Sequence, residues 1–514
     1  MTSLLTICAE RMKAMTVASL VASSLTLGAC HDLDSPDLNA ATTNDLTGAP
    51  SRVGIATAAQ GLLGSVTGTN VGVRNIFGTN RGNMGILGRE AYNLDVSNPQ
   101  NIPPLYTSVG GNSFKNLTTW TGPYATMYQA NVVIKGAESA PPAPTGLEDA
   151  EREALKGFAE TIKALELFYV IRQTDQSGAA LDALESPTDD PPPIAGKAEV
   201  YAKILSYLDE AKNHLDAGGA SFPFTMPTGW AAFNTPAKFL QFNRAVRAWV
   251  NITNLAFANA LADVNASFLD PAKPMSYGAY HTFSTTPGDA LNTAYDPTGR
   301  QLYASREFAD SAQLKSPGGA RDDRFTTKLI TLRDLTGGAT DSVTRYGFNV
   351  RYAFNIYPTN VSPAVVLKNE QLLLIRAEAN IGLGNNSLAI ADLNLVRAAS
   401  GGLPPISDPY VPNAALKQPD VCRTQACASA AIKSTALLEE LLYEKRYSLM
   451  YENGDRWVDA RKYGRIQDLE RDREGDINWA YLMIPINECI LRGSNQPPGC
   501  TTFPPFFANP IAAY

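Results

Sequence analysis

The sequence predicts a mostly α-helical protein whose helices come in pairs. Apolar side chains recur at the helical period in successive segments, and Gly or Pro residues separate these segments. An isolated pair can bury its apolar face only against a neighbouring pair, as in helical-repeat proteins. The content of 44% apolar and 18% charged residues is typical of a globular protein with a packed core. We therefore predict four tetratricopeptide-like helix pairs, degenerate in sequence, with loop-rich insertions.

The chain begins with a targeting segment. Arg11 and Lys13 precede a short apolar run at 14–25, and the residues Leu-Gly-Ala before Cys30 have the pattern of a lipobox. We predict that residues 1–29 are a lipoprotein signal peptide and that acylated Cys30 attaches the protein to a membrane. An ordinary secretory signal and an uncleaved anchor are the alternatives.

Residues 30–50 are polar and rich in Asp, Asn and Thr, which is typical of a solvated tether. We place a single domain at 51–514, after this tether. Met12 could be the true start, because the residues before it add little that a signal peptide needs.

The first half of the domain has clear helical periods. Residues 70–115 are rich in Gly and Asn and have no period, so we expect loop with short helical pieces there. An aromatic stripe from Trp120 through Tyr124 to Tyr128 shares one helix face with Met127, and we expect this stripe in the core. Helices are expected at Ser51–Val66, Trp120–Gly136, Leu147–Arg172, Glu199–Leu215 and Phe239–Leu261.

Residues 264–363 differ from the rest of the chain, because Tyr, Thr, Gly, Asp and Pro replace the helical pattern. We predict an irregular insertion there, between helix-pair regions at about 118–263 and 364–465. Helices in the second region are expected at 369–379, 387–396, 437–452 and 455–463.

Four cysteines remain besides Cys8 and Cys30. Outside the cytoplasm an even number of cysteines indicates disulfides, and nearest-neighbour pairing joins Cys422 to Cys427 and Cys489 to Cys500. A zinc site is the alternative, although the spacing lacks the short paired pattern of a zinc ribbon.

Composition and motifs argue against several classes of function. The net charge of −7 and the lack of a basic stripe argue against nucleic acid as a partner. The sequence has three His and no nucleophile elbow, phosphate-binding loop or zinc-protease motif. Adjacent carboxylates such as Asp322 and Asp323 are more simply explained as solvated charges than as a glycosidase pair. We therefore expect no enzyme activity, no cofactor and no metal.

The C-terminal part carries the most specific motifs. Leu-Ile-Arg-Ala-Glu-Ala at 374–379 precedes Asp-Leu-Asn-Leu-Val-Arg at 392–397, and Glu-Lys-Arg-Tyr-Ser-Leu-Met-Tyr-Glu-Asn-Gly-Asp-Arg-Trp-Val-Asp follows at 444–459. Trp-x3-Tyr-x3-Tyr-x-Ala-Asn at 120–131 and Ile-Pro-Ile-Asn-Glu at 484–488 accompany them. Together these segments closely resemble the RagB/SusD family of outer-membrane lipoproteins.

This resemblance implies a SusD-like fold and a non-catalytic role in nutrient uptake. Such a protein would bind an oligosaccharide or another polymeric nutrient at the cell surface and deliver it to a TonB-dependent β-barrel transporter in the outer membrane. Asp32, Asp34 and Asp37 resemble a surface-export signal, for which a solvated linker is the alternative.

The polar residues of these motifs have a simpler role than ligand binding. Charged groups beside a helical core need partners, so we expect salt bridges and hydrogen bonds between neighbouring helices. The residues concerned are Glu378, Arg397, Glu444, Arg446, Glu452, Arg456, Trp457 and Asp459.

Loop aromatics are the candidates for ligand binding, because a sugar presents an apolar ring face that stacks on Tyr or Trp. We predict Tyr92, Arg89, Tyr106, Tyr280 and Tyr303 as ligand-binding residues. Two other functions stay open: a periplasm-facing helical-repeat scaffold for protein partners, and a surface glycosidase. Peptide is an alternative to glycan as the ligand.

Overall fold

The chain divides into two compact units, Met1–Asp45 and Leu46–Tyr514. The computed structural model describes residues 43–70, 80–94, 114–184, 190–287, 289–296, 302–416, 436–471, 473, 476–493, 496–502 and 506–507. The signal peptide, Cys30, most of the tether, Tyr106 and the pair Cys422 and Cys427 lie outside these residues, so the statements about them remain predictions. No helix within the described ranges is long and apolar enough to span a membrane.

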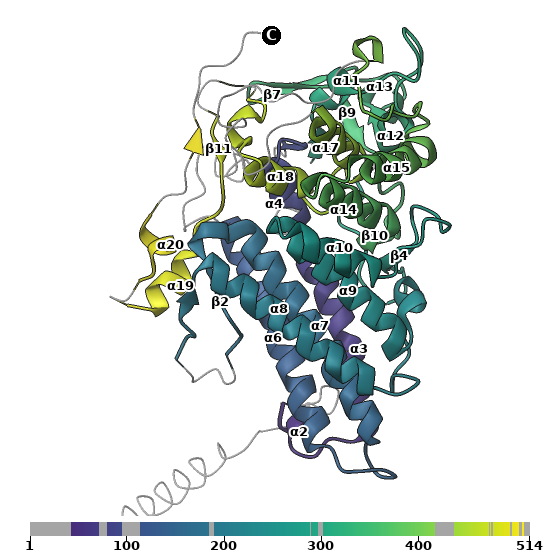
Figure 1. Ribbon diagram of the computed structural model, residues 1–514. Coiled ribbons are helices and arrows are strands. Elements are labelled where there is room, and N and C mark those ends of the chain that lie inside the picture. Colours follow the sequence, from purple (N-terminus) through teal and green to yellow (C-terminus); the bar gives the residue numbers. More distant parts are fainter. Residues whose placement is uncertain are drawn as a thin grey trace, which may run out of the picture. The chain divides into compact units, whose positions relative to one another are not determined.

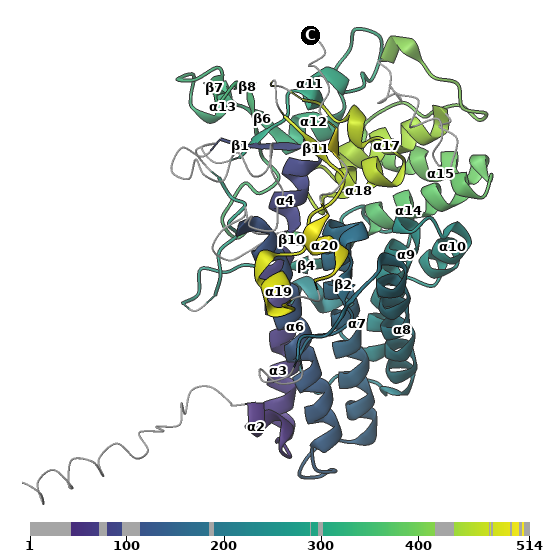
Figure 2. The ribbon, with the colours of Figure 1, turned by 90° about the vertical axis from the view of Figure 1, so that its left-hand side faces the viewer.

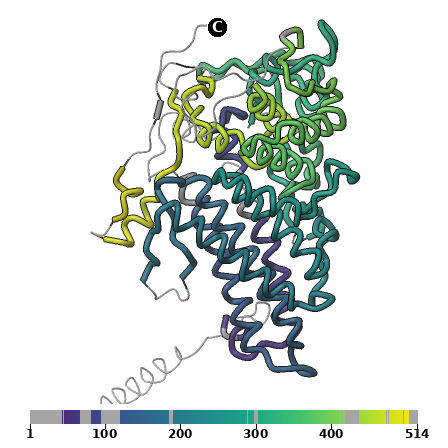
Figure 3. Tube along the Cα trace, in the orientation of Figure 1, coloured from purple at the N-terminus to yellow at the C-terminus, as the bar shows by residue number. Residues whose placement is uncertain are grey.

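Long helices form the first half of the second unit, and Figures 1 and 3 show them side by side. Helix α7 lies between α6 and α8 (Figure 2), and α9 packs against α8. The first helices are α2 Thr43–Thr47, α3 Arg52–Asn70, α4 Asn80–Leu87, α6 Phe114–Ser139, α7 Asp149–Thr174, α8 Lys197–Ala217, α9 Pro236–Thr253 and α10 Phe257–Asn265.

Helix α7 is buried along nearly its whole length from Ala154 to Thr174, because helices pack on both of its sides. Phe158, Ile162 and Phe168 belong to the main hydrophobic core. Gly157 allows α8 to approach closely, since a Cβ atom there would lie 2.7 Å from the carbonyl oxygen of Ala211. The helical period predicted for this segment is confirmed.

The helix predicted at Phe239–Leu261 is wrong as a single helix. It is divided into α9 and α10 at Leu255, whose φ of +59° is incompatible with a continuous right-handed helix. The segment 70–115, predicted as loop with short helical pieces, contains α4 and strand β1 Ala91–Asn93 in its described part.

Helices α14, α15 and α17, seen in the upper part of Figure 1, pack around a separate core. Helix α14 contacts α15 and α17, and α17 contacts α18. These and the shorter helices are α11 Glu307–Ser311, α12 Asp323–Lys328, α13 Leu332–Leu335, α14 Asn369–Gly382, α15 Asn386–Val396, α17 Ala436–Ser448, α18 Asp455–Lys462, α19 Ile486–Leu491 and α20 Pro498–Thr501.

Strands are concentrated in the segment predicted as an irregular insertion. A four-stranded antiparallel sheet has the order β1-β5-β9-β6, and its aromatic and aliphatic side chains form a second core with α17. The remaining strands pair as β10-β4, β2-β3, β7-β8 and β11-β12. Their bounds are β2 Ala179–Ala180, β3 Ile194–Ala195, β4 Gly278–His281, β5 Leu302–Ala304, β6 Leu329–Thr331, β7 Val343–Arg345, β8 Phe348–Val350, β9 Tyr352–Phe354, β10 Ala364–Lys368, β11 Asn478–Trp479 and β12 Phe506–Phe507.

Candidate functional site

The charged motif residues form an internal ion-pair network, as predicted. Glu378 on α14 accepts hydrogen bonds from Lys445 on α17, at 2.8 Å, and from the hydroxyl of Tyr463, at 2.6 Å. Lys445 also donates to Asp459 on α18 at 2.8 Å. These buried contacts join α14 to the consecutive helices α17 and α18, which follow much later in the chain.

The electrostatics of this network favour charged side chains. Burial alone would raise the pKa of Asp459, but the ammonium groups of Lys445 and Lys462 overcome this effect and lower it. Burial alone would lower the pKa of Lys445, and Asp459 and Glu378 raise it instead. The pairing of Lys445 with Asp459 therefore favours the charged form of both side chains.

A second part of the network connects α17 to the insertion. Glu444 is fully buried and accepts from Arg397 at 2.7 Å and from Arg324 at 2.5 Å. Arg324 also pairs with Asp322, whose carboxylate accepts from the hydroxyl of Tyr443 at 2.8 Å. The expectation that Asp322 is a solvated charge is thus wrong, because this carboxylate is buried in an ion pair.

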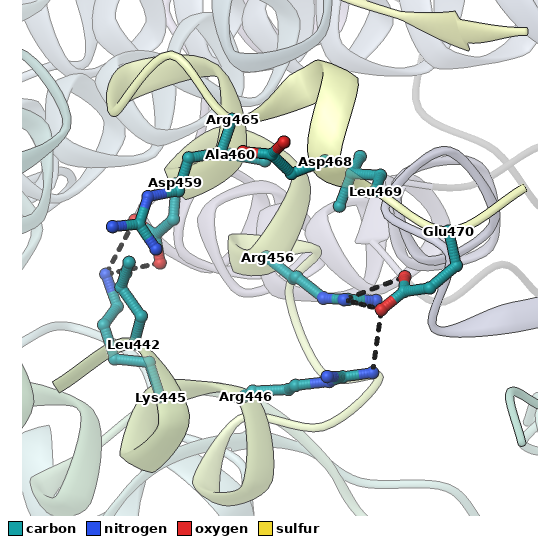
Figure 4. Close-up of a pocket in the computed structure, with 10 residues that line it drawn as sticks. All are labelled: Leu442, Lys445, Arg446, Arg456, Asp459, Ala460, Arg465, Asp468, Leu469 and Glu470. Atoms are coloured by element: carbon teal, nitrogen blue, oxygen red, sulfur yellow. Dashed lines mark hydrogen bonds and ion pairs between the residues drawn. The ribbon is translucent and has the colours of Figure 1, made fainter. Parts of the chain in front are cut away.

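The pocket in Figure 4 lies within this helical centre. Side chains of α17 and α18 and of the segment after α18 converge on it, and Glu470 receives hydrogen bonds from Arg456 at 2.7 and 2.9 Å. Its volume of about 60 Å³ suits a few water molecules. Paired charges and small size make this pocket a structural feature of the helix interface.

Three of the predicted ligand-binding residues are buried, so the prediction is wrong for them. Tyr92 and Tyr303 are opposite each other on β1 and β5 and are 1% and 2% exposed. Arg89 is 1% exposed, and its guanidinium donates to the side chain of Asn478 at 3.1 Å and to the carbonyl of Ile477 at 2.9 Å. The two tyrosines lie inside the sheet and Arg89 binds the segment at 477–478, so none of the three presents a surface to a ligand.

Tyr280 is partly exposed, and its assignment to a ligand site stays a prediction. Its hydroxyl donates to the carbonyl of Ser276 at 2.6 Å, and burial raises its pKa to about 12. Tyr280 belongs to β4, in the two-stranded sheet with β10, whereas Tyr92 and Tyr303 belong to the four-stranded sheet.

A much larger cavity lies beside α6, and we name it the aromatic groove. It has a volume of about 480 Å³ and is bounded by α6, by residues 182–184 and 191–192 of the connection between β2 and β3, and by α19 with Arg492. Figure 3 shows the C-terminal segment that contains α19, in yellow, beside the blue segments of the first half. The lining residues are Trp120, Thr121, Tyr124, Ala125, Tyr128, Gln129, Ala180, Asp182, Ala183, Leu184, Pro191, Pro192, Glu488, Leu491 and Arg492.

The aromatic stripe of α6 forms one wall of the groove. Trp120 is buried behind Tyr124, with ring centroids 5.0 Å apart. Tyr124 and Tyr128 are partly exposed, and the hydroxyl of Tyr124 donates to the carbonyl of Ala180 at 2.7 Å. The prediction of a core stripe is confirmed for Trp120 and Met127, whereas the two tyrosines also reach the groove.

Asp182 holds the β2–β3 side of the groove in place. Its carboxylate accepts from Lys163 at 2.8 Å, from Tyr207 at 2.6 Å and from Asn131 at 3.1 Å. Burial alone would raise the pKa of Asp182, and these donors, Lys163 first, lower it. Asp182 is therefore a fixed, charged anchor.

Arg492 closes the opposite side. Its guanidinium donates to the Glu488 carboxylate at 2.9 Å and to the carbonyl of Pro192 at 2.7 Å, which links α19 to the β2–β3 connection. Its Nε hydrogen has no acceptor in the described part of the chain, although the side chain is only 8% exposed. The disulfide between Cys489 and Cys500, as predicted, joins α19 to α20 behind this wall.

Sequence reasoning missed the groove because its walls come from distant segments. Tyr128 and Arg492 are separated by most of the chain, and nothing in either segment indicates the other. The one usable signal was the pair of tyrosines four residues apart on a helix that otherwise reads as core.

No group of His, Cys, Asp and Glu side chains in the described ranges is arranged to hold a metal ion. The acidic and basic residues instead neutralise one another in the ion pairs described above.

Comparison with known proteins identifies the fold. No family model and no curated protein matches the sequence. Among solved structures, a SusD superfamily protein from Bacteroides vulgatus ATCC 8482 aligns with a TM-score of 0.60 and 16% identity, covering 87% of this chain and 99% of that chain. The chain has the SusD-like fold.

Two further SusD-like structures extend this similarity. A laminarin-binding SusD-like protein aligns with a TM-score of 0.55 and 15% identity, covering 87% of this chain and 99% of that one. A SusD-like carbohydrate-binding protein from Bacteroides vulgatus ATCC 8482 aligns with a TM-score of 0.55 and 14% identity, covering 81% of this chain and 84% of that one. The mostly α-helical, SusD-like architecture predicted from the sequence is thus confirmed.

Proposed function

We propose that this protein is a non-catalytic, surface-exposed outer-membrane lipoprotein that captures oligosaccharide and delivers it to a TonB-dependent transporter. The observation that carries the proposal is the SusD-like fold, shared over most of the chain with a protein that binds laminarin. The lipobox at Cys30 supports the membrane anchor, and the sequence resemblance to the RagB/SusD family supports the transporter partner.

The pairing of the carboxylates supports binding without catalysis. A glycosidase needs two carboxyl groups that face each other across a sugar ring. Asp322 is buried against Arg324, and the neighbouring Asp323 turns to Lys315 at 2.7 Å. Glu439 and Glu440 are likewise buried and paired, with Arg465 and Arg397.

Glycan binding is tested with the mature chain, expressed from residue 31 so that it carries no lipid. Isothermal titration and affinity electrophoresis should detect binding to at least one of laminarin, starch, xylan and mannan. Chromatography of the same mixtures should detect no shortened products. A folded protein that binds none of these glycans, or that shortens one of them, would contradict the proposal.

The partner and location are tested in cells. The lipidated protein, solubilised gently from outer membranes, should co-purify with a TonB-dependent barrel in near-equal amount, and protease added to intact cells should cleave it. Resistance to surface protease together with co-purification of periplasmic proteins would instead support the scaffold function. A Cys30→Ser variant, which cannot be acylated, should be released from the membrane.

A further inference from the structure

We propose that the aromatic groove is an oligosaccharide-binding site, in which Tyr128 and Tyr124 stack against sugar rings and Gln129, Glu488 and Arg492 bind their hydroxyl groups. This inference rests on the proposed function and adds the location of the site and the class of ligand. The ligand is an unbranched segment of a neutral glycan.

The size and lining of the groove fit a ligand. Small-molecule sites typically enclose about 300–1,000 Å³ and combine apolar walls with a few convergent polar groups. The aromatic groove, at about 480 Å³, lies in this range, whereas the pocket between α17 and α18 measures about 60 Å³. The groove therefore has room for a short oligosaccharide.

The two tyrosines are spaced as a stacking platform. Residues four apart on an α-helix lie on one face, separated by about 6 Å along the axis. This separation is comparable to the length of one sugar residue in an extended chain, so successive rings can meet Tyr124 and Tyr128. Trp120 supports the first ring from behind, and Pro191 and Pro192 provide an apolar wall. Stacking of this kind requires an accessible, unbranched face on each sugar.

The polar groups at the edge suit hydroxyls. The side-chain oxygen of Gln129 accepts from Ser65 at 2.6 Å, which orients the amide and leaves its NH2 group for a ligand. Glu488 uses one carboxylate oxygen for Arg492, so the other can accept from a hydroxyl. Arg492 lines the same edge, and its Nε hydrogen has no acceptor among the described residues, so we assign a sugar oxygen as its acceptor.

Charge at the groove favours a neutral glycan. The Asp182 carboxylate has its acceptor sites filled by the side chains of Lys163, Tyr207 and Asn131 and by the amide of Ala183, so it positions the wall and does not contact the ligand. Glu488 already neutralises Arg492. Asp182 is likewise paired with Lys163, so an acidic sugar would meet no unpaired cation at these residues.

The walls are preorganised. The disulfide joins α19 to α20, and α20 packs against the residues after α7, where a Cβ atom on Gly499 would lie 2.5 Å from the carbonyl oxygen of Ser177. The Tyr124 hydroxyl ties α6 to β2. A binding site whose walls are already fixed loses little entropy when the ligand enters.

The site is tested by comparing Tyr128→Ala with Tyr346→Ala in the mature chain, with the best-bound glycan of the panel as the probe. We expect Tyr128→Ala to weaken binding about tenfold or more and Tyr346→Ala, at an exposed tyrosine outside the groove, to leave it unchanged. Tyr280→Ala is measured beside them because Tyr280 is the other candidate for the site. Gln129→Ala, at an exposed position, should weaken binding without affecting folding. Circular dichroism and melting of each variant exclude unfolding as the cause.

The outcomes separate this inference from the proposed function. If the wild-type protein binds glycan and Tyr128→Ala and Gln129→Ala bind equally well, the groove is not the site, while glycan capture stands. Loss in Tyr280→Ala alone would place the site at β4. If no glycan binds and an apolar dye binds the wild type but not Tyr128→Ala, the groove takes an apolar partner, and both proposals fail. Tighter binding of a uronic-acid glycan than of neutral ones would overturn the ligand class.

Discussion

The ion-pair centre of α14, α17 and α18 and the aromatic groove beside α6 are both cavities bordered by charged side chains. They differ in how completely those charges are paired and in how much space remains. In the centre, each charge of the motif meets an opposite charge, and the remaining space is about 60 Å³. In the groove, about 480 Å³ lies between partly exposed tyrosines and the guanidinium of Arg492, whose Nε hydrogen has no acceptor in the part of the chain that the structure describes. The charged motifs of the C-terminal part therefore hold the fold together, whereas the aromatic motif at 120–131 and the segment at 484–488 line the larger cavity.

The largest expected effect is the loss of stability when one partner is removed from the ion-pair centre. Glu444→Ala should lower the free energy of unfolding by about 3–5 kcal/mol, because the buried Arg324 and Arg397 lose a shared carboxylate. Urea denaturation measures this change. Arg333→Ala is the matched control, since its pair with Asp341 is exposed and contributes at most about 1 kcal/mol.

Glycan binding per folded molecule should be the same in Glu444→Ala as in the wild type. A direct loss of affinity in a variant that remains folded would show that the centre takes part in binding, and would remove the distinction between the two regions.

Acid should also lower the stability of the ion-pair centre. Burial alone would raise the pKa of Glu370, but Lys368, at 2.9 Å, and Lys328 lower it to about 2. Because this folded-state pKa lies below the unfolded value of about 4.3, the contribution is complete above about pH 5 and is lost as the pH falls toward 2. We expect a loss on the order of 2 kcal/mol over this window.

Glu370→Gln tests this assignment, because the amide does not titrate. Unfolding free energies of the two proteins, measured from pH 6 to pH 3, should converge as the pH falls. Parallel curves would mean that Glu370 does not contribute to acid sensitivity.

The disulfide is expected to matter for the groove and not for the centre. The double substitution Cys489→Ser and Cys500→Ser should lower stability by about 2–3 kcal/mol, the effect of opening a short cross-linked loop. It should also weaken glycan binding, because Glu488 and Arg492 flank the cross-link. Titration calorimetry of folded protein measures the second effect.

Reductant distinguishes this disulfide from other thiols. It should weaken binding to the wild type and leave the double variant unchanged. If reductant weakened glycan binding equally in both proteins, it would act through a group other than the Cys489–Cys500 disulfide.

The smallest effect concerns a single hydroxyl in the groove wall. Tyr124→Phe removes the donor to Ala180 and should cost about 1 kcal/mol of stability. Binding should weaken less than in Tyr128→Ala, since the ring remains. Tyr128→Phe is the control and should retain both stability and affinity. If Tyr124→Phe lost more affinity for glycan than Tyr128→Ala, the hydrogen bond that fixes the groove wall would contribute more to binding than ring stacking does.

Helical periodicity predicted the elements well where one face is buried against a neighbour. Helices α7 and α14 follow the expected apolar spacing, and the disulfide pairing of Cys489 with Cys500 followed from proximity in sequence. The charges of the C-terminal motifs were correctly expected to form ion pairs, because a charge beside a helical core needs a partner. The break at Leu255 was missed, since a single residue of positive φ leaves no mark on the apolar period.

Site prediction failed where residues meet across long distances in the chain. Tyr92 and Tyr303 look like loop aromatics in sequence, yet they are cross-strand neighbours inside a sheet. Period-two alternation was too short in β1 and β5 to indicate strands, because each strand has three residues.

The sequence by itself determined the helices, their pairing and the internal ion pairs, because these depend on local periodicity and on charges that must be neutralised near a core. Only the tertiary structure decided which aromatic side chains are accessible. The apolar pattern of α6 predicts that Tyr124 and Tyr128 are core residues. They line a cavity because space remains between α6, α19 and residues 182–184 and 191–192. Exposure is a property of how segments pack, and no local pattern encodes it.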